Sequence, residues 1–209
     1  MDPLETIYSI DNLSWPGIEM KLVAFNGSPR KEGDTSRILK EIVKIADGKG
    51  YEVEYIDLAD HDIGFCRGCM GCKRGDSCIL EDDMQKMYGK IHEADVLVFG
   101  SPIYMCSETG LFKNFIDRLY ALMAISEKED RMYDSRLTPG KKAIIVYTCG
   151  TKDGNILYHY MNGKVAGLFS GMLGINDFNS QIVPGTLQLK DVLDTPYAKA
   201  FLETVKNDL

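Results

Sequence analysis

The residues with the clearest chemical potential are four cysteines that lie close together in the sequence. They form the run C-x2-C-x2-C-x5-C and occupy positions Cys66, Cys69, Cys72 and Cys78. Three thiolates at successive two-residue spacings allow one short turn to bind three irons of a cubane, and a fourth thiolate then binds the last iron. A structural zinc site more often uses two separated C-x-x-C pairs. The run therefore favours an iron-sulfur cluster, and zinc or unligated thiols are the alternatives.

The spacing of this run is not that of a bacterial ferredoxin. In ferredoxins three residues separate the third and fourth cysteines, and a proline follows the last one. Here five residues intervene and Ile79 follows Cys78. We therefore expect a long loop, residues 62–80, inserted in a different kind of domain.

Length and composition indicate one globular domain. The chain has 209 residues, of which 44% are apolar and 26% are charged, and both fractions are close to the average for folded proteins. No apolar run approaches the length of a membrane span. The net charge of -7 and the pI near 5.0 argue against nucleic acid and anionic membranes as partners.

Residues 1–20 are expected to form an N-terminal extension of a domain that covers residues 21–209. The extension contains no lysine or arginine, so it lacks the basic start of a signal or transit peptide. We therefore expect a cytoplasmic protein. In that reducing compartment, six cysteines indicate metal or redox chemistry in preference to disulfides.

Apolar runs alternate with helical patterns along the chain, which is typical of parallel strands joined by helices. Runs without alternation, as in strands buried on both faces, cover residues 22–25, 96–99 and 143–147. Residues 51–58 alternate and are placed near an edge, and a fifth strand is expected over residues 176–183. The pattern predicts an α/β three-layer sandwich with a five-stranded parallel sheet of order 2-1-3-4-5. Such sheets bind ligands beyond the carboxyl ends of their central strands.

One of the expected helices, residues 155–172, carries an unusual row of glycines. Gly163, Gly167 and Gly171 lie four residues apart. Because a glycine row lets backbones approach closely, we expect tight packing there, against another helix or at a subunit contact.

The first expected strand ends in a loop suited to an anion. This phosphate loop, residues 26–36, reads N-G-S-P-R-K-E-G-D-T-S and enters a helix. Ser28, Thr35 and Ser36 offer hydroxyl donors, and Arg30 adds a positive charge. The helix start adds unsatisfied amides and the positive end of its dipole. The loop matches neither the dinucleotide fingerprint nor the P-loop, and an ordinary polar turn is the alternative.

Two further loops are expected at the same edge of the sheet. They read S-P-I-Y-M-C at residues 101–106 and T-C-G-T at residues 148–151. Together with the phosphate loop they can frame a flat ring. Cys106 and Cys149 have no evident basic partner, so we expect both to be small buried residues. No motif gives a histidine a catalytic role, and any reaction should depend on a cofactor.

These motifs together resemble the iron-sulfur flavoproteins, a branch of the flavodoxin-like NADPH-dependent FMN reductases. The resemblance is carried by N-G-S-P-R-K, by the cysteine run leading into I-L-E-D-D-M, by G-S-P-I-Y and by F-I-D-R-L. It covers the chain from Lys21 to the end and is most specific over residues 21–122. The cysteine run distinguishes this branch from cluster-free flavin reductases. The resemblance implies a flavodoxin-like fold.

The resemblance also implies a set of site residues. The FMN phosphate would be held by Ser28, Arg30, Thr35 and Ser36. The isoalloxazine ring would contact Pro102, Ile103, Tyr104 and Met105, with Thr148, Cys149 and Gly150 on its other side. The ligands of a [4Fe-4S] cluster would be Cys66, Cys69, Cys72 and Cys78. Asp34 stands where relatives usually have asparagine, and since a phosphate would repel it, we expect it to cap the helix.

The implied function is an oxidoreductase that moves electrons between a [4Fe-4S] cluster and FMN and delivers them to a small-molecule acceptor. The resemblance implies a homodimer or homotetramer, with NAD(P)H as one candidate electron donor. A ferredoxin-like protein is another candidate donor, suggested by the charges on the cysteine loop. Arg67, Lys73 and Arg74 lie among the cysteines. Their charges can raise the potential of a cluster, dock an acidic carrier, or simply be solvated.

Two other functions fit the same sequence. The first is an NAD(P)H-dependent FMN or quinone reductase without an iron-sulfur cluster, whose cysteines bind zinc or nothing. The second is a flavodoxin-like carrier that binds flavin and docks partners without turning over a substrate.

Overall fold

The computed structural model describes residues 20–152, 156–188 and 191–209. The expected N-terminal extension, residues 1–20, therefore lies outside the described residues except for Met20. Within the described residues, no helix has both the length and the apolar composition needed to cross a membrane.

The main sheet has five parallel strands in the order β2-β1-β3-β7-β8. These strands are β2 (Glu52–Asp57), β1 (Lys21–Asn26), β3 (Val96–Tyr104), β7 (Lys142–Thr148) and β8 (Asp177–Val183). The predicted flavodoxin-like order 2-1-3-4-5 is confirmed, and the alternating strand β2 lies at an edge. The carboxyl ends of β1, β3 and β7 therefore meet at one edge of the sheet, as parallel neighbours must.

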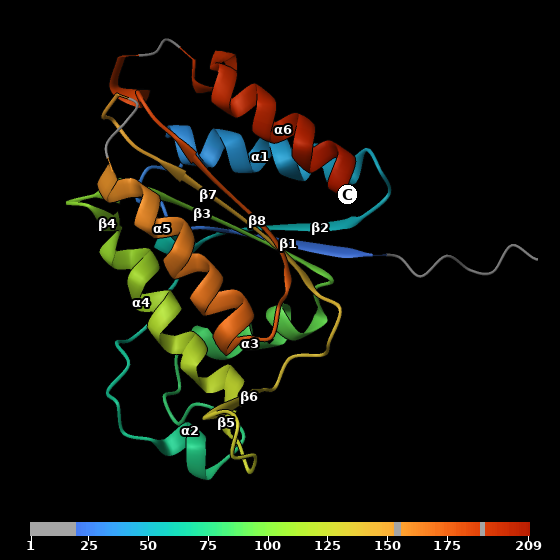
Figure 1. Cartoon of the computed structure of the whole chain (residues 1–209), viewed down its shortest axis with the longest axis vertical. Coiled ribbons are helices and arrows are strands. Elements are labelled where there is room, and N and C mark those ends of the chain that lie inside the picture. The colour runs from blue at the N-terminus through green and yellow to red at the C-terminus, as the bar shows by residue number, and fades with distance from the viewer. Residues whose placement is uncertain (1–19, 153–155, 189–190) are drawn as a thin grey trace, which may run out of the picture.

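Helices cover both faces of the sheet, as Figure 1 shows. One face carries α1 (Asp34–Asp47) and α6 (Pro196–Asp208). The other face carries α3 (Met84–Glu93), α4 (Gly110–Arg118) and α5 (Ile156–Ala166). Short 3-10 turns lie at η1 (Leu58–Asp60), η2 (Leu119–Leu122), η4 (Thr186–Gln188) and η5 (Val192–Asp194).

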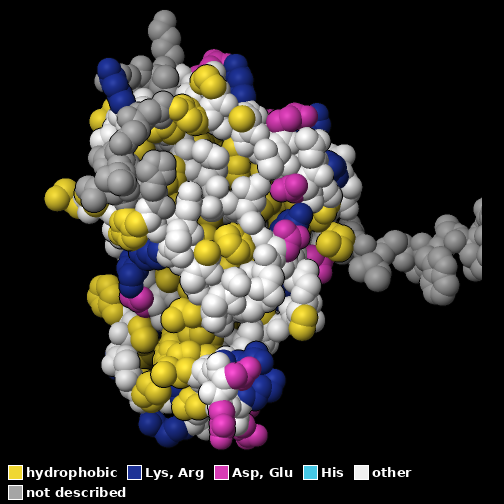
Figure 2. Space-filling view, in the orientation of Figure 1, with side chains coloured by type: hydrophobic (Ala, Val, Ile, Leu, Met, Phe, Trp, Pro, Cys, Tyr) yellow, Lys and Arg dark blue, Asp and Glu magenta, His cyan; other side chains and the backbone are white. Residues whose placement is uncertain are grey.

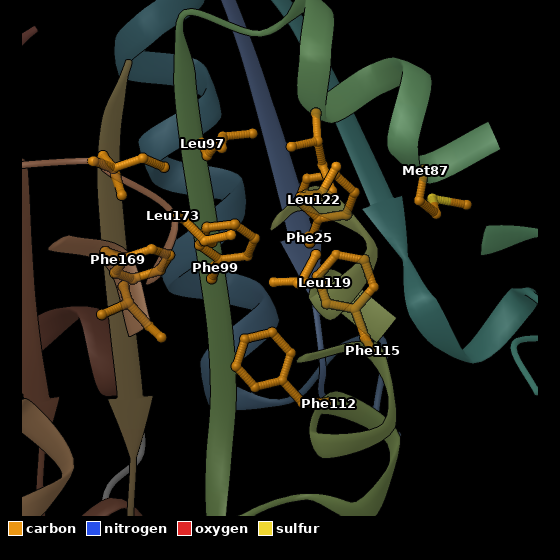
Figure 3. Packing of buried hydrophobic residues seen from close by; sticks show 14 of the residues in the cluster. Phe25, Met87, Leu97, Phe99, Phe112, Phe115, Leu119, Leu122, Phe169 and Leu173 are labelled. Carbon is orange, nitrogen blue, oxygen red and sulfur yellow. The ribbon is translucent and has the colours of Figure 1, made fainter. Parts of the chain in front are cut away.

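Aromatic side chains hold α4 against the sheet (Figure 3). Phe25 of β1 stacks on Phe99 of β3, with ring centroids 5.5 Å apart, and lies 5.0 Å from the ring of Phe115 on α4. Phe112, one turn earlier on α4, lies 6.2 Å from Phe99. Such ring pairs contribute about 0.5–1.5 kcal/mol each beyond their burial. The position of α4 relative to the carboxyl ends of β1 and β3 is therefore well determined.

The cysteine loop, residues 62–80, lies at one end of the molecule (Figure 1). It contains a single short helix, α2 (Gly71–Arg74). The small antiparallel pair β5 (Met123–Ile125) and β6 (Tyr133–Ser135) lies beside it.

Two elements differ from the sequence expectation. β3 does not end near residue 100 but continues to Tyr104 and folds back as a hairpin with β4 (Ser107–Glu108). The expected helix over residues 155–172 changes at Gly167 into the π-helix η3 (Gly167–Met172). The glycines of the expected helix, Gly163, Gly167 and Gly171, make no close contact with another element. A Cβ atom at any of them would meet no atom within 4 Å among the described residues. The predicted tight packing is therefore wrong within the chain.

Candidate functional site

The phosphate loop, residues 26–36, is tied to both β3 and α4. The Gly27 amide donates to the carbonyl of Gly100 in β3 (2.7 Å), and the Gly27 carbonyl accepts a hydrogen bond from Thr109 Oγ1 (2.7 Å). Thr109 is the N-cap of α4. A Cβ atom at Gly27 would lie 2.5 Å from the Cβ of Phe112, so only glycine allows this close approach to α4.

We expect Gly27→Ala to lower the free energy of unfolding by about 1–3 kcal/mol, because the added methyl group overlaps Phe112. Gly89→Ala is the matched control. Gly89 is exposed in the middle of α3, and a Cβ there meets no described atom within 4 Å. The control should be stabilised by about 0.5–1 kcal/mol, since alanine favours a helix more than glycine does. Urea unfolding followed by circular dichroism measures both, and an unchanged midpoint for Gly27→Ala would contradict the close contact.

The three hydroxyls predicted to bind phosphate are buried and bonded within the protein. Ser28 Oγ and Ser36 Oγ both donate to the carbonyl of Arg30, at 3.2 and 2.8 Å. Thr35 Oγ1 shares a 2.6 Å hydrogen bond with Thr148 Oγ1. The last bond joins Thr148, the final residue of β7, to the phosphate loop, so these two predicted parts of the site do lie together.

The start of α1 has no side-chain cap. Its N-cap is Gly33, and no side chain accepts a hydrogen bond from the first turn. The expectation that Asp34 caps the helix is wrong, because Asp34 is the first helical residue. The Arg30 side chain, which is exposed, runs beside the helix start, since a Cβ at Gly33 would lie 3.3 Å from Arg30 Nε. Uncapped amides, the positive end of a helix dipole and an adjacent guanidinium fit a phosphate group.

Asn26 organises the phosphate loop, a role that its residue type alone did not predict. It is fully buried at the end of β1. Its Nδ2 donates to Ser36 Oγ (2.9 Å) and to Asp57 Oδ1 (2.6 Å), and its Oδ1 accepts the Ser28 amide (3.1 Å). One amide side chain thus fixes both ends of the loop. The only sequence signal was a polar residue at the end of an apolar strand.

The β3-β4 hairpin carries the residues predicted to contact a flavin ring. Pro102 and Ile103 are buried, whereas Tyr104 is 46% and Met105 97% exposed. Met105 and Cys106 form the turn with φ angles of 47° and 65°, a left-handed conformation that such side chains rarely adopt. The expectation that Cys106 is buried is wrong, because its thiol is exposed.

The loop after β7 supplies the other predicted ring contacts. Thr148 and Cys149 are buried, and the Cys149 amide donates to the carbonyl of Val183 (3.0 Å). Leu187, which no sequence pattern indicated, lies directly over Gly150. A Cβ atom at Gly150 would come within 2.5 Å of its side chain, which is nevertheless 84% exposed. An exposed apolar residue therefore borders the predicted ring site.

A buried ion pair locks the β3-β4 hairpin to α5. Lys164 Nζ lies 2.6 Å from both carboxylate oxygens of Glu108, whose side chain is fully buried. Burial is the largest single influence on the pKa of Glu108 and raises it. The hydrogen bond and charge of Lys164, the Glu108 amide and the Ser107 hydroxyl together outweigh burial and hold the pKa below the ordinary 4.5. Burial likewise raises the pKa of Tyr147, and the charge of Glu108 adds to that effect.

We expect Lys164→Met to destabilise the protein at neutral pH by about 3 kcal/mol, because it leaves a buried carboxylate unpaired. In the wild type, the stability that this pair contributes is present above the ordinary pKa of 4.5 and is lost as pH falls through the lower folded pKa. In the variant, burial raises the pKa of Glu108 instead. The deficit should therefore shrink as pH falls towards 4.5, and thermal unfolding between pH 7 and pH 4 measures this.

Lys113→Met is the control for that experiment. Lys113 forms an ion pair with Asp117 on α4, but both side chains are exposed. Removing such a surface pair should change stability by less than about 0.5 kcal/mol at any pH in this range. A similar loss in both variants would show that the Glu108 pair has no special importance.

The four cysteines of the loop are all free thiols in different surroundings. Cys66 and Cys69 are exposed, Cys78 is partly buried and Cys72 is buried. Cys78 packs against the hydrophobic core. Within the described residues, no three His, Cys, Asp or Glu side chains come together as a metal-binding group. The structure thus places the cysteines on one loop without gathering their thiols.

Basic side chains hold the middle of this loop in place. Lys73 Nζ donates to the carbonyls of Tyr120 (2.5 Å) and Met123 (2.6 Å) and lies 3.6 Å from the centroid of the Tyr120 ring. Arg136 Nη2 donates to the carbonyl of Gly75 (2.9 Å). Burial lowers the pKa of Lys73, although the charges of two loop cysteines act in the opposite direction. Lys73 is therefore not a solvated loop charge.

An apolar groove begins beside Cys66. Two cavities, of about 400 and 390 Å³, share Ile116, Leu168 and Met172 between α4 and η3. Cys66 lines the first of them. Figure 2 shows hydrophobic side chains gathered over the lower ends of α4 and α5 on this face. The side of the loop that carries Cys66 therefore opens onto an apolar surface.

Some known proteins are similar to this chain in sequence, and others are similar to it in fold. An iron-sulfur flavoprotein of Archaeoglobus fulgidus is 37% identical over 167 residues, which cover 80% of this chain and 78% of that protein. An iron-sulfur flavoprotein of Methanocaldococcus jannaschii is 36% identical over 99 residues, covering 47% of this chain and 51% of that protein. With the second relative, the match thus spans about half the length of each protein.

Solved structures agree on the fold alone, because their sequence identity is low. An NAD(P)H:quinone oxidoreductase from Methanothermobacter marburgensis superposes with a TM-score of 0.67 at 14% identity, covering 90% of this chain and 96% of that one. An FMN-dependent NADH-azoreductase from Bacillus anthracis gives 0.63 at 15% identity, covering 90% and 97%. The family model described as NADPH-dependent FMN reductase matches residues 20–182. The chain therefore belongs to the NADPH-dependent FMN reductase family and is an oxidoreductase of the flavoprotein type.

Proposed function

We propose that this flavoprotein moves electrons between a [4Fe-4S] cluster and FMN and delivers them to a small-molecule acceptor. The observation that carries the proposal is the four-cysteine loop in a chain of FMN reductase type, placed at the far end of the helix that supports the phosphate loop. The name iron-sulfur flavoprotein, which the relatives carry, supports the same conclusion.

The FMN part of the proposal rests on the start of α1. The phosphate would lie at the uncapped amides there, beside Arg30, with the hydroxyls of Ser28, Thr35 and Ser36 around it. The ring would lie against residues 102–105 and 148–150, at the edge where β3 and β7 end. When bound, FMN supplies the exchange of one or two electrons, and the cluster supplies single electrons.

The cluster part of the proposal rests on the chemistry of the donors. Four thiols are the donor set that a cubane requires, and two of them are accessible at the surface of the loop. Cys66, Cys69, Cys72 and Cys78 would be the ligands. Lys73 supports this assignment, because a positive charge held beside thiolates stabilises a negatively charged metal centre.

A second function stands beside the first. It is an NAD(P)H-dependent FMN or quinone reductase in which the cysteines bind zinc or nothing. The family description favours it, because that description names dependence on NADPH.

Rapid mixing under anaerobic conditions separates the two functions. We expect a reduced ferredoxin to bleach the flavin absorbance of the metal-loaded protein and to fail after the metal has been removed with a chelator. The alternative predicts that NADPH bleaches the flavin at the same rate with and without metal.

The proposed assembly is a homodimer or homotetramer. Light scattering on the protein as it elutes from a size-exclusion column measures its mass directly.

A further inference from the structure

The cysteine loop is closed at its base by a buried arginine from α4. Arg118 is 1% exposed, and its Nη1 donates to the carbonyl of Gly64 (2.7 Å), just before the first cysteine. The same guanidinium binds both carboxylate oxygens of Asp82, after the last cysteine, at 2.5 and 3.0 Å. A single side chain therefore holds both ends of the segment 64–82.

Asp82 and its neighbour complete this closure with backbone bonds. Asp82 Oδ2 accepts the Gly64 amide (2.9 Å), and Asp82 Oδ1 accepts the amide of Met84, the first residue of α3 (3.0 Å). The Asp83 carboxylate accepts the Asp62 amide (3.0 Å), and the Asp83 amide donates to the Asp62 carbonyl (3.1 Å). Several bonds thus join residues 62–64 to residues 82–84, which together form the neck of the loop. The Asp82 carboxylate takes part in most of them, and Asp83 supplies the others.

Burying this guanidinium costs free energy, because the charge loses its contact with water. The geometry of the ion pair offers a reason for keeping it. A planar guanidinium binds a carboxylate in one orientation only, which gives the pair its geometric precision. Arg118 Nε finds no hydrogen-bond partner among the described residues, so the site is not optimised for stability alone. A buried pair of this kind is often no more stabilising than apolar side chains of the same size.

The helix that carries Arg118 also supports the phosphate loop. Thr109, its N-cap, binds the Gly27 carbonyl, and Arg118, its last residue, binds the neck. The helix has nine residues, and the nine steps from Thr109 to Arg118 correspond to about 13.5 Å at 1.5 Å per residue. One rigid element therefore sets the separation between the two loops.

We propose that Arg118 is a positioning residue, whose bonds to Asp82 and Gly64 order the cysteine loop at the end of α4 whether or not metal is bound. This inference rests on the proposed function in one respect, namely that the ordered loop is the one that receives the cluster. The ordering of the loop does not depend on metal. A test can therefore separate the role of Arg118 from the proposed function.

The variant that tests this is Arg118→Met/Asp82→Leu. It removes both charges together, so that no buried charge is left unpaired and the fold should persist. The first readout is hydrogen exchange, without metal, at the Lys73 and Gly75 amides of the loop, which bond only within the loop. We expect these amides to exchange at least about tenfold faster in the variant, while β3 amides stay protected. The second readout is iron and acid-labile sulfide after anaerobic reconstitution, which should fall about tenfold, with FMN affinity unchanged.

Two further variants exclude a merely structural effect. Arg118→Lys keeps the charge but loses the two-pronged geometry, and should show the same defects to a smaller degree. Lys164→Met breaks a buried ion pair away from the loop and should lower stability without changing loop exchange. Unchanged exchange in the double variant would overturn the proposal, as would full cluster loading in it. Failure of the wild type to take up iron and sulfide would refute the proposed function instead, and the exchange result would still decide the role of Arg118.

Discussion

Cys69→Ser should abolish the cluster and leave FMN binding intact. Cys69 is exposed on the cysteine loop, so its replacement costs the fold little, yet a cubane loses one of its four thiolates. After anaerobic reconstitution we expect iron and sulfide to fall at least about tenfold and visible absorbance to retain only the flavin bands. The phosphate loop lies on the other end of α4, which is why the flavin should remain.

Cys106→Ser is the matched control for this prediction. Cys106 is also an exposed thiol, but it lies in the hairpin after β3 and outside the cysteine run. Iron and sulfide content should therefore equal that of the wild type. Loss of both FMN and metal in Cys69→Ser would contradict the account, because it would show that the loop is not independent of the flavin site.

Arg30→Glu should weaken FMN binding by about 100-fold, and Arg30→Gln by about tenfold. The neutral variant loses a charge-assisted hydrogen bond to the phosphate, which contributes about 1.5–3 kcal/mol. The acidic variant adds repulsion between a carboxylate and the phosphate dianion. Because Arg30 is exposed, neither change should affect folding. Quenching of flavin fluorescence on titration measures the dissociation constants.

Riboflavin provides the internal control for this series. It has the same ring as FMN but no phosphate, so its affinity should be equal in the wild type and both variants. If both ligands weakened together, Arg30 would act on the ring or on the fold. If neither weakened, the phosphate would lie away from the start of α1.

The centre of the sheet was predictable because β1, β3 and β7 are buried on both faces. Uninterrupted apolar runs such as residues 143–147 have few alternative structures, and parallel order follows from the helices between them. The end of β3 was not predictable, because Ser101 and Pro102 look like a loop locally. The strand is extended by the pairing of Ser101 and Pro102 with β7 and of residues 103–104 with β4, and pairing is a tertiary property.

The phosphate loop was predictable from residue types, whereas its organising residues were not. Hydroxyl side chains before a helix indicate an anion site on their own. Asn26 and Leu187 act through contacts with distant residues, Asp57 and Gly150, that no local pattern contains. The contacts of Arg118 with the neck were not predictable for the same reason, because its partners are 36 and 54 residues away in the sequence.

The cysteine run was evident from its spacing, but spacing fixes only which thiols are available. Where the thiols point depends on the loop backbone, which has left-handed residues at Gly68 and Met70. It also depends on tertiary packing, as where Cys78 lies against the hydrophobic core. Sequence patterns describe ligand types better than ligand directions.

The most direct test of the central claim is the stoichiometry of the protein purified and reconstituted without oxygen. Iron, acid-labile sulfide, zinc and FMN are measured per chain on one sample. The account predicts about four irons, about four sulfides and about one FMN, with little zinc. Zinc without sulfide, or FMN with neither metal, would contradict it.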